Sequence, residues 1–129
     1  MTIRGAVEAG RQLGRTLGFP TANVRLSPQV EPPRAGVWLA RVTLPANGKP
    51  YWALVNVGHR PTVETRGEWK AEAWLLDFEG DLYGQVIDIE LLRFLRTERK
   101  FDSLDALREA MLQDKQHAIN IIANHEFTL

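Results

Sequence analysis

The sequence predicts a mainly β fold, a small closed barrel of antiparallel strands with one helix packed outside it. Two observations carry this prediction. Apolar residues alternate with a period of two in several short stretches, which turns rich in glycine and proline separate. From Ser103 onward the apolar spacing becomes helical. Several strands followed by one amphipathic helix are typical of such barrels, and 129 residues suffice for a single domain, 1–129.

The first clear strand covers residues 36–44. One face of this strand is apolar at alternate positions, Trp38, Ala40, Val42 and Leu44. The opposite face becomes polar at Arg41 and Thr43. Residues 45–50 read Pro-Ala-Asn-Gly-Lys-Pro and predict a hairpin connection. Residues 51–57 are therefore the returning strand.

Two further strands are predicted at 69–78 and 86–95. In the former, alternation places Trp69 and Leu75 on one face and Glu72 on the other. In the latter, the apolar phase changes at Leu92, which predicts a β-bulge. Glycines and acidic residues between 79 and 84 supply the turn that joins them.

The last predicted element is a helix over about 104–123. Apolar residues recur at helical spacing at Leu104, Leu107, Met111, Ala118 and Ile122. Ser103 is placed to cap the helix, and Asp105 lies in the first turn, where the helix dipole favours an acid. The polar run 113–117 indicates a kink or a frayed middle.

Composition excludes several classes of protein. Sixteen Lys and Arg balance sixteen Asp and Glu, which argues against a protein that coats nucleic acid. The chain has no cysteine, so disulfides, thiolate metal sites and thiol nucleophiles are ruled out. No apolar run has the length of a membrane span, and the N-terminus lacks the apolar core of a signal peptide. We therefore expect a cytoplasmic protein without a nucleic-acid or membrane partner.

The sharpest local motif is the segment 10–23. Its glycines, Gly10, Gly14 and Gly18, would let backbone N–H groups converge on a phosphate. Their spacing does not match a P-loop. An ordinary surface loop is the alternative that this spacing also suits. Thr21 and Asn23 face the same side of an extended backbone and offer neutral oxygens that suit Mg²⁺. The alternative is a turn that these side chains stabilise.

Two other places carry polar groups with a candidate role. Glu72 lies mid-strand between Ala71 and Ala73. A carboxylate there faces either water or a functional cavity. In the second case its small neighbours would leave room for a substrate. A basic cluster with an aromatic residue follows the last strand, Arg93, Arg96, Arg99, Lys100 and Phe101. This cluster suits a phosphate or a flat ring, and equally a solvated junction between strand and helix.

In their order along the chain, these motifs resemble the riboflavin kinase family, in particular the C-terminal kinase module of bacterial bifunctional FAD synthetases. The matching stretches are Gly-Arg-Thr-Leu-Gly-Phe-Pro-Thr-Ala-Asn at 14–23, Gly-Val-Trp at 36–38, Asn-Val-Gly-His-Arg-Pro-Thr at 56–62, Glu72 leading to Leu-Leu-Asp-Phe at 75–78, Asp-Leu-Tyr-Gly at 81–84, and Leu-Arg-Thr-Glu-Arg-Lys-Phe-Asp-Ser-Leu at 95–104. The resemblance implies a six-stranded antiparallel Greek-key barrel with a C-terminal helix. It also implies Mg²⁺-dependent phosphorylation of riboflavin by ATP, which gives FMN and ADP.

The resemblance implies roles for individual residues as well. Glu72 matches the catalytic glutamate, which accepts the proton of the ribityl 5′-hydroxyl. Thr21 and Asn23 match the pair that contacts Mg²⁺ and phosphate. The other positions on the ATP or phosphate side are Gly10, Arg15, Gly18, Leu75 and Tyr83, and those on the flavin side are Arg96, Arg99 and Phe101.

The sequence departs from the family pattern in two ways. Trp74 stands where bacterial members often carry a histidine. Bacterial bifunctional enzymes also carry an FAD-forming adenylyltransferase module before the kinase, so we expect an excised module of a longer chain or a stand-alone kinase, without FAD formation. One alternative is a non-catalytic flavin- or nucleotide-binding barrel. The other is an oligonucleotide-binding barrel, and the charge balance disfavours this second alternative.

Overall fold

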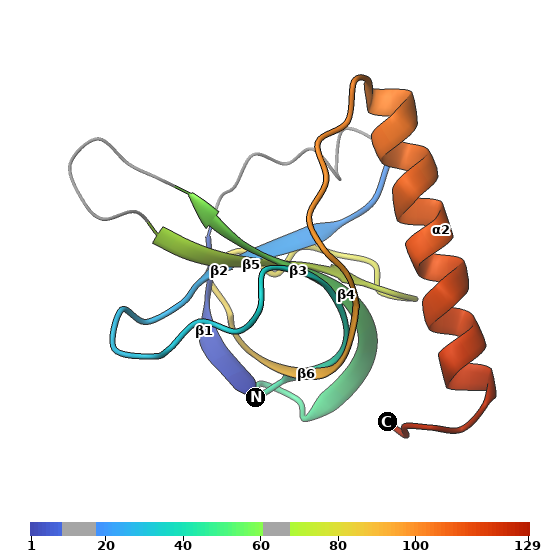
Figure 1. The fold of residues 1–129 in the computed structure, drawn as a ribbon. Helices are drawn as coiled ribbons and strands as arrows, with labels where there is room; N and C mark the ends of the chain where they lie inside the picture. Colours follow the sequence, from blue (N-terminus) through green and yellow to red (C-terminus); the bar gives the residue numbers. More distant parts are fainter. Residues whose placement is uncertain (9–17, 61–67) are drawn as a thin grey trace.

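The computed structural model describes residues 1–8, 18–60 and 68–129, and the predicted phosphate-side residues Gly10 and Arg15 lie outside these ranges. Over the described residues, six strands close into a barrel with a C-terminal helix beside it (Figure 1). The elements are β1 (Thr2–Glu8), β2 (Thr21–Arg25), β3 (Gly36–Leu44), β4 (Lys49–Arg60), β5 (Glu68–Leu75), β6 (Val86–Arg96) and α2 (Leu104–Ala123). The predicted fold class is confirmed.

The strands are all antiparallel to their neighbours, in the order β1-β2-β5-β4-β3-β6, and β6 pairs with β1 to close the barrel. β3, β4 and β5 are adjacent in sequence order, while β2 lies beside β5 and β6 lies beside β3, which is Greek-key topology. The predicted bulge is confirmed. The β3–β6 register shifts between Leu39 and Ala40, which leaves Leu92 as the extra residue.

Two strand boundaries differ from the prediction. β4 extends beyond 51–57 at both ends because it pairs with β3 as far as Lys49 and with β5 as far as Arg60. β5 ends at Leu75 rather than at residue 78, because the chain turns at Asp77, whose φ of 59° lies in the left-handed region.

The barrel and the helix bury two apolar clusters. The first fills the barrel interior and includes Ala40, Val42 and Leu44, as predicted from their alternation. The second lies between the outer face of the barrel and α2, and consists of Val37, Leu39, Leu54, Trp74, Leu76, Ala118 and Ile121. Both faces of β3, β4 and β5 are therefore apolar over part of their length, one toward the interior and one toward the helix.

Helix α2 runs without interruption, so the polar run 113–117 does not fray it. Ser103 caps the helix as predicted, and its Oγ accepts a hydrogen bond of 3.0 Å from the N–H of Ala106. Asp114 explains part of the polar run, because it is buried and forms an ion pair with Arg96 of β6. The described chain contains no helical segment with the length and hydropathy of a membrane span.

An ion pair holds the seam of the barrel, and a side-chain hydrogen bond holds the chain end. Arg4 of β1 and Asp88 of β6 are register partners, and the guanidinium donates two hydrogen bonds of 2.5 and 2.8 Å to the carboxylate. These hydrogen bonds lower the pKa of Asp88 from its ordinary value and raise the pKa of Arg4. After α2 the chain returns to the barrel, where Arg41 donates to the carbonyl oxygen of Thr128.

Candidate active site

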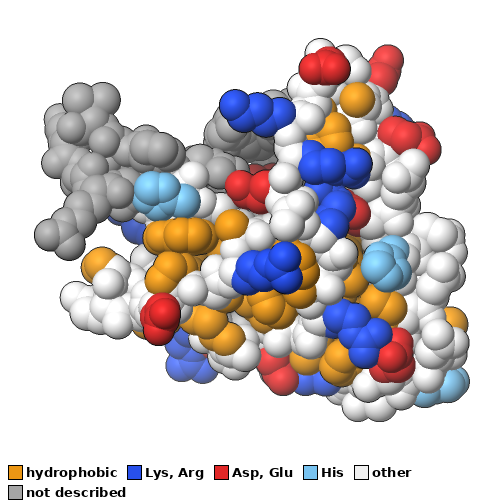
Figure 2. All heavy atoms as spheres, in the orientation of Figure 1, with side chains coloured by type: hydrophobic (Ala, Val, Ile, Leu, Met, Phe, Trp, Pro, Cys, Tyr) orange, Lys and Arg blue, Asp and Glu red, His pale blue; other side chains and the backbone are white. Residues whose placement is uncertain are grey.

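A cavity of about 670 Å³ lies between the outer face of the barrel and the N-terminal half of α2. Residues of β2, β4 and β5 line one side, while the segment 98–103 and the helix line the other. Its volume suits a small molecule of drug or cofactor size. On the face seen in Figure 2, basic side chains follow the junction of barrel and helix, with apolar atoms between them.

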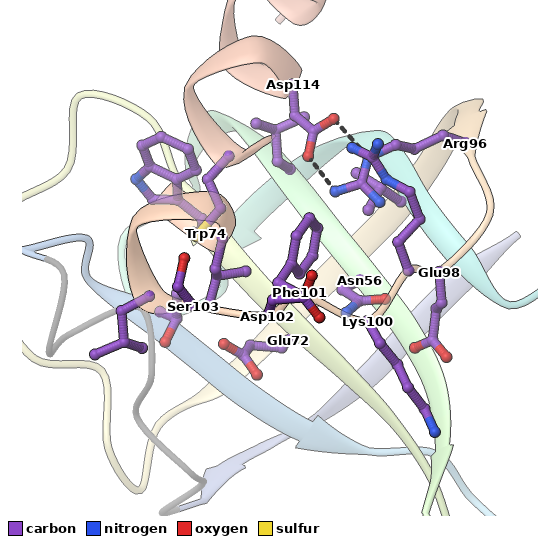
Figure 3. A pocket seen from close by; sticks show the side chains of 17 residues that line it. Asn56, Glu72, Trp74, Arg96, Glu98, Lys100, Phe101, Asp102, Ser103 and Asp114 are labelled. Carbon is purple, nitrogen blue, oxygen red and sulfur yellow. Dashed lines mark hydrogen bonds and ion pairs between the residues drawn. The ribbon is translucent and has the colours of Figure 1, made fainter. Parts of the chain in front are cut away.

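Three polar side chains form a row across neighbouring strands, and two of them line this cavity. Glu72 of β5 is the register partner of Asn23 on β2 and of Asn56 on β4. Glu72 and Asn56 both line the cavity (Figure 3). Because side chains alternate along a strand, the residues on either side of each row member point into the barrel interior.

The cavity decides between the two orientations that the sequence left open for Glu72. Its side chain is half-buried and faces the cavity rather than open solvent. The expected reason for the room around it was wrong, because Ala71 and Ala73 are fully buried in the barrel interior, on the opposite face. The room comes instead from the separation of barrel and helix, where Trp74 and Met111 line the cavity.

Thr21 and Asn23 lie on the outer face of β2, as the alternation predicted, while Ala22 and Val24 fill the interior. Asn23 is buried, with 8% of its surface exposed, and pairs in register with Glu72. Thr21 lines the cavity and also a smaller recess. A hydroxyl and an amide oxygen are hard, neutral donors of the kind that Mg²⁺ accepts when phosphate and water complete its shell. This donor set therefore fits a magnesium–phosphate site beside Glu72.

The other predicted nucleotide-side residues, Leu75, Gly18 and Tyr83, do not line the main cavity. Leu75 contacts the smaller recess, which Thr21 also lines, although most of its side chain is buried in the barrel interior. Gly18 stands before β2 with a φ of 88°, a conformation that glycine adopts without strain. Tyr83 is 65% exposed and lines neither cavity in the described part of the chain, and its backbone N–H donates to Asp81.

The predicted flavin-side residues Arg96, Arg99 and Phe101 all line the cavity. The guanidinium carbons of Arg99 and Arg96 lie 5.4 and 5.9 Å from the centre of the Phe101 ring, within the range of cation–π attraction. Arg96 also donates two hydrogen bonds, of 2.8 and 2.7 Å, to Asp114 (Figure 3). Arg93 lies away from the cavity and pairs with the C-terminal segment, so the basic cluster of the sequence divides into two groups.

Sequence reasoning assigned no role to Asn56, and missed the role of Phe19. Trp74 stacks on Phe19 with ring centres 4.4 Å apart and planes 28° from parallel. The stack fixes the chain against β5 two residues before Thr21. A signal for Asn56 was present, because it stands between two valines as Glu72 stands between two alanines.

Known riboflavin kinases resemble this chain in sequence. A family model described as flavokinase, riboflavin kinase, matches residues 1–122. A bifunctional riboflavin kinase/FMN adenylyltransferase of Bacillus subtilis (strain 168) is 40% identical over 124 residues, which are 95% of this chain and 39% of that protein. The chain thus spans less than half the length of that relative.

Solved structures share the fold. A crystal structure of riboflavin kinase from Trypanosoma brucei has a TM-score of 0.69 and 28% identity, and the match covers 97% of this chain and 81% of that one. A crystal structure described as a macrolide-efflux protein from Streptococcus pneumoniae has a TM-score of 0.83 and 33% identity, with 92% of this chain and 38% of that one covered.

Proposed function

The chain belongs to the riboflavin kinase family, and we propose that it transfers the γ-phosphoryl group of ATP to the ribityl 5′-hydroxyl of riboflavin, giving FMN and ADP. The observation that carries this proposal is the polar row on the outer face of the barrel. Glu72 lines a cavity large enough for a flavin and is the register partner of Asn23, one of the magnesium-type donors of β2. A base beside both a phosphate site and an organic-substrate site is what a phosphotransferase requires.

Glu72 acts as the general base. The 5′-hydroxyl oxygen attacks the γ-phosphorus, its proton passes to the carboxylate of Glu72, and the bond from the γ-phosphorus to the bridging oxygen breaks so that ADP leaves with its electrons. The transition state of such a transfer is loose, and catalysis is therefore mostly positioning and charge stabilisation. The carboxylate needs only to be close and ionised when the proton moves late in the reaction.

Thr21 and Asn23 are the residues that would hold Mg²⁺ with the nucleotide phosphates. When bound, the ion supplies positive charge that neutralises the phosphate oxygens. Asn23 is held rigidly, because it is buried and paired in register with Glu72. This rigidity keeps the phosphate side at a fixed distance from the base, which serves the geometric demand of an in-line transfer.

The flavin ring belongs in the part of the cavity that Phe101 and Arg99 line. An aromatic side chain gives a flat surface for stacking, and the nearby guanidinium adds attraction for the polar edge of the ring. Apolar residues of the helix, Leu107 and Met111, complete the wall. A flat, mostly apolar ring with a polar edge matches this mixed lining.

The test is to incubate the protein with riboflavin, ATP and Mg²⁺ and to separate the flavins by chromatography. We expect FMN and ADP in equal amounts. Quenching of flavin fluorescence without FMN would favour a binding barrel that does not turn over. If neither FMN nor quenching is observed, the proposed function is wrong.

A further inference from the structure

A buried amide oxygen without a partner faces the cavity. The Oδ1 atom of Asn56 is buried and has no hydrogen-bond partner among the residues that the structure describes. Asn56 is also one of the residues that line the cavity (Figure 3). A buried carbonyl oxygen that has lost its hydrogen bonds to water destabilises the folded state unless a donor reaches it. Such an atom in a cavity wall therefore marks a position where a ligand can restore the missing hydrogen bond.

The place of Asn56 in the sheet indicates which donor reaches it. Its register partner on β5 is Glu72, and its register partner on β3 is Val37, which carries no polar side chain. Side chains that are directly opposed on neighbouring antiparallel strands lie about 5 Å apart at their Cβ atoms. The ligand group that donates to Asn56 is therefore only a few covalent bonds away from the ligand group that contacts Glu72.

We propose that Asn56 is a positioning residue for the substrate's polyol chain, and that its Oδ1 accepts a hydrogen bond from a secondary hydroxyl near the reacting primary hydroxyl. This inference rests on the proposed function, in which Glu72 accepts the proton of the primary hydroxyl. The polar row then follows the substrate in order, with Asn23 beside the phosphate, Glu72 at the reacting oxygen and Asn56 at the neighbouring hydroxyls. The ring beyond these hydroxyls reaches Phe101.

An amide suits this position better than a carboxylate. A second carboxylate directly opposite Glu72 would repel it, so that one of the two groups would hold a proton and could not accept another. The neutral amide oxygen accepts a hydrogen bond without this penalty. Asn56 therefore aligns the polyol chain without adding a negative charge opposite Glu72.

The contact also makes Asn56 a specificity residue. A bound flavin excludes water from the cavity. If its side chain lacks secondary hydroxyls, Asn56 Oδ1 is then left without a hydrogen-bond donor. A site built to bond a hydroxyl discriminates strongly against an analogue without that hydroxyl, because a buried polar group then has no partner. Wild-type protein should therefore prefer riboflavin over a flavin with an unbranched 5-hydroxypentyl chain.

The experiment measures kcat/KM for riboflavin and for this 5-hydroxypentyl flavin, with saturating ATP and Mg²⁺. Asn56→Ala is expected to lower kcat/KM for riboflavin roughly 10- to 100-fold and to change kcat/KM for the analogue by less than about threefold. Asn56→Ser, whose shorter side chain withdraws the acceptor but stays polar, should show a smaller loss that is again confined to riboflavin. Asn120→Ala, on the exposed face of α2, is the matched control and should leave both values unchanged.

Each outcome decides the inference. An equal loss for both flavins in Asn56→Ala would mean a structural role and would overturn it. If Asn56→Ala does not fold, the same comparison in Asn56→Ser decides, with a selective loss in support and an equal loss against. If wild-type protein forms FMN, the proposed function stands whatever Asn56 does. If wild-type protein forms none, the proposed function fails and the inference fails with it.

Discussion

Removing the carboxylate of Asp114 tests how α2 is held against the barrel. Asp114 accepts two hydrogen bonds, of 2.8 and 2.7 Å, from the guanidinium of Arg96. The side chains are only 11% and 22% exposed, so water screens this pair poorly. Asp114→Ala leaves a mostly buried guanidinium without its partner at the cavity wall.

The structure sets the size of the effect. Breaking a fully buried ion pair by removing one partner costs about 3–5 kcal/mol, and an exposed pair contributes about 0–1 kcal/mol. Because this pair is bidentate but not completely buried, we expect a loss of about 2–3 kcal/mol. For a domain of this size, that loss lowers Tm by roughly 8–12 °C. Arg96→Met combined with Asp114→Leu should recover much of the stability, since an apolar pair leaves no buried charge.

The matched control is the ion pair between Arg93 and Glu126. Its shortest distance, 2.8 Å, is nearly the same, but its side chains are 41% and 36% exposed. Glu126→Ala should therefore lower Tm by no more than about 4 °C. Thermal unfolding followed by circular dichroism measures both variants under one condition. If the two substitutions lower Tm equally, burial does not decide the strength of these pairs and the reasoning is refuted.

Three further predictions concern the proposed active site and the barrel seam. Glu72→Gln should lower kcat about 10²- to 10⁴-fold while the affinity for ATP, measured by calorimetry, changes little; comparable FMN formation would remove Glu72 from the role of base. Thr21→Ala should raise KM for MgATP roughly tenfold and KM for riboflavin far less, and the reverse order would reassign Thr21. Because Arg4 lowers the pKa of Asp88 below its ordinary value of 3.8, the pair contributes stability above about pH 4 that disappears as the pH falls through the lowered pKa. The difference in Tm between wild type and Arg4→Met should therefore be constant near neutral pH and shrink toward pH 2, and a difference that grows in acid would contradict this account.

Much of the fold could be predicted because local periodicity decides it. The two-residue alternation of 36–44 and the phase change at Leu92 are properties of the chain itself, and both were confirmed. The helix could be located for the same reason, through its spacing and the cap at Ser103. Strand ends were less predictable, because β4 continues to Lys49 and Arg60 only where neighbouring strands offer partners.

The candidate site was less predictable because it depends on register. Glu72 was conspicuous as an acid within a strand, but nothing local indicates that Asn23 and Asn56 lie on either side of it. The pairing of Arg96 with Asp114 joins a strand to a helix and is likewise a property of the packed molecule. The family resemblance supplied roles for Glu72 and Arg96, whereas the contacts that fix their positions came from the structure.

The fold explains why the proposed site is outside the barrel. A six-stranded barrel has an interior only wide enough for side chains, and here residues such as Val24, Val55 and Ala73 fill it with no exposed surface. A ligand must therefore bind on the outer face. Alternation requires each outward polar residue to stand between two residues that point inward, and Asn23, Glu72 and Asn56 all do so. The packed interior thus holds the three strands in register, and this register sets the spacing of the proposed phosphate, base and polyol positions across the row.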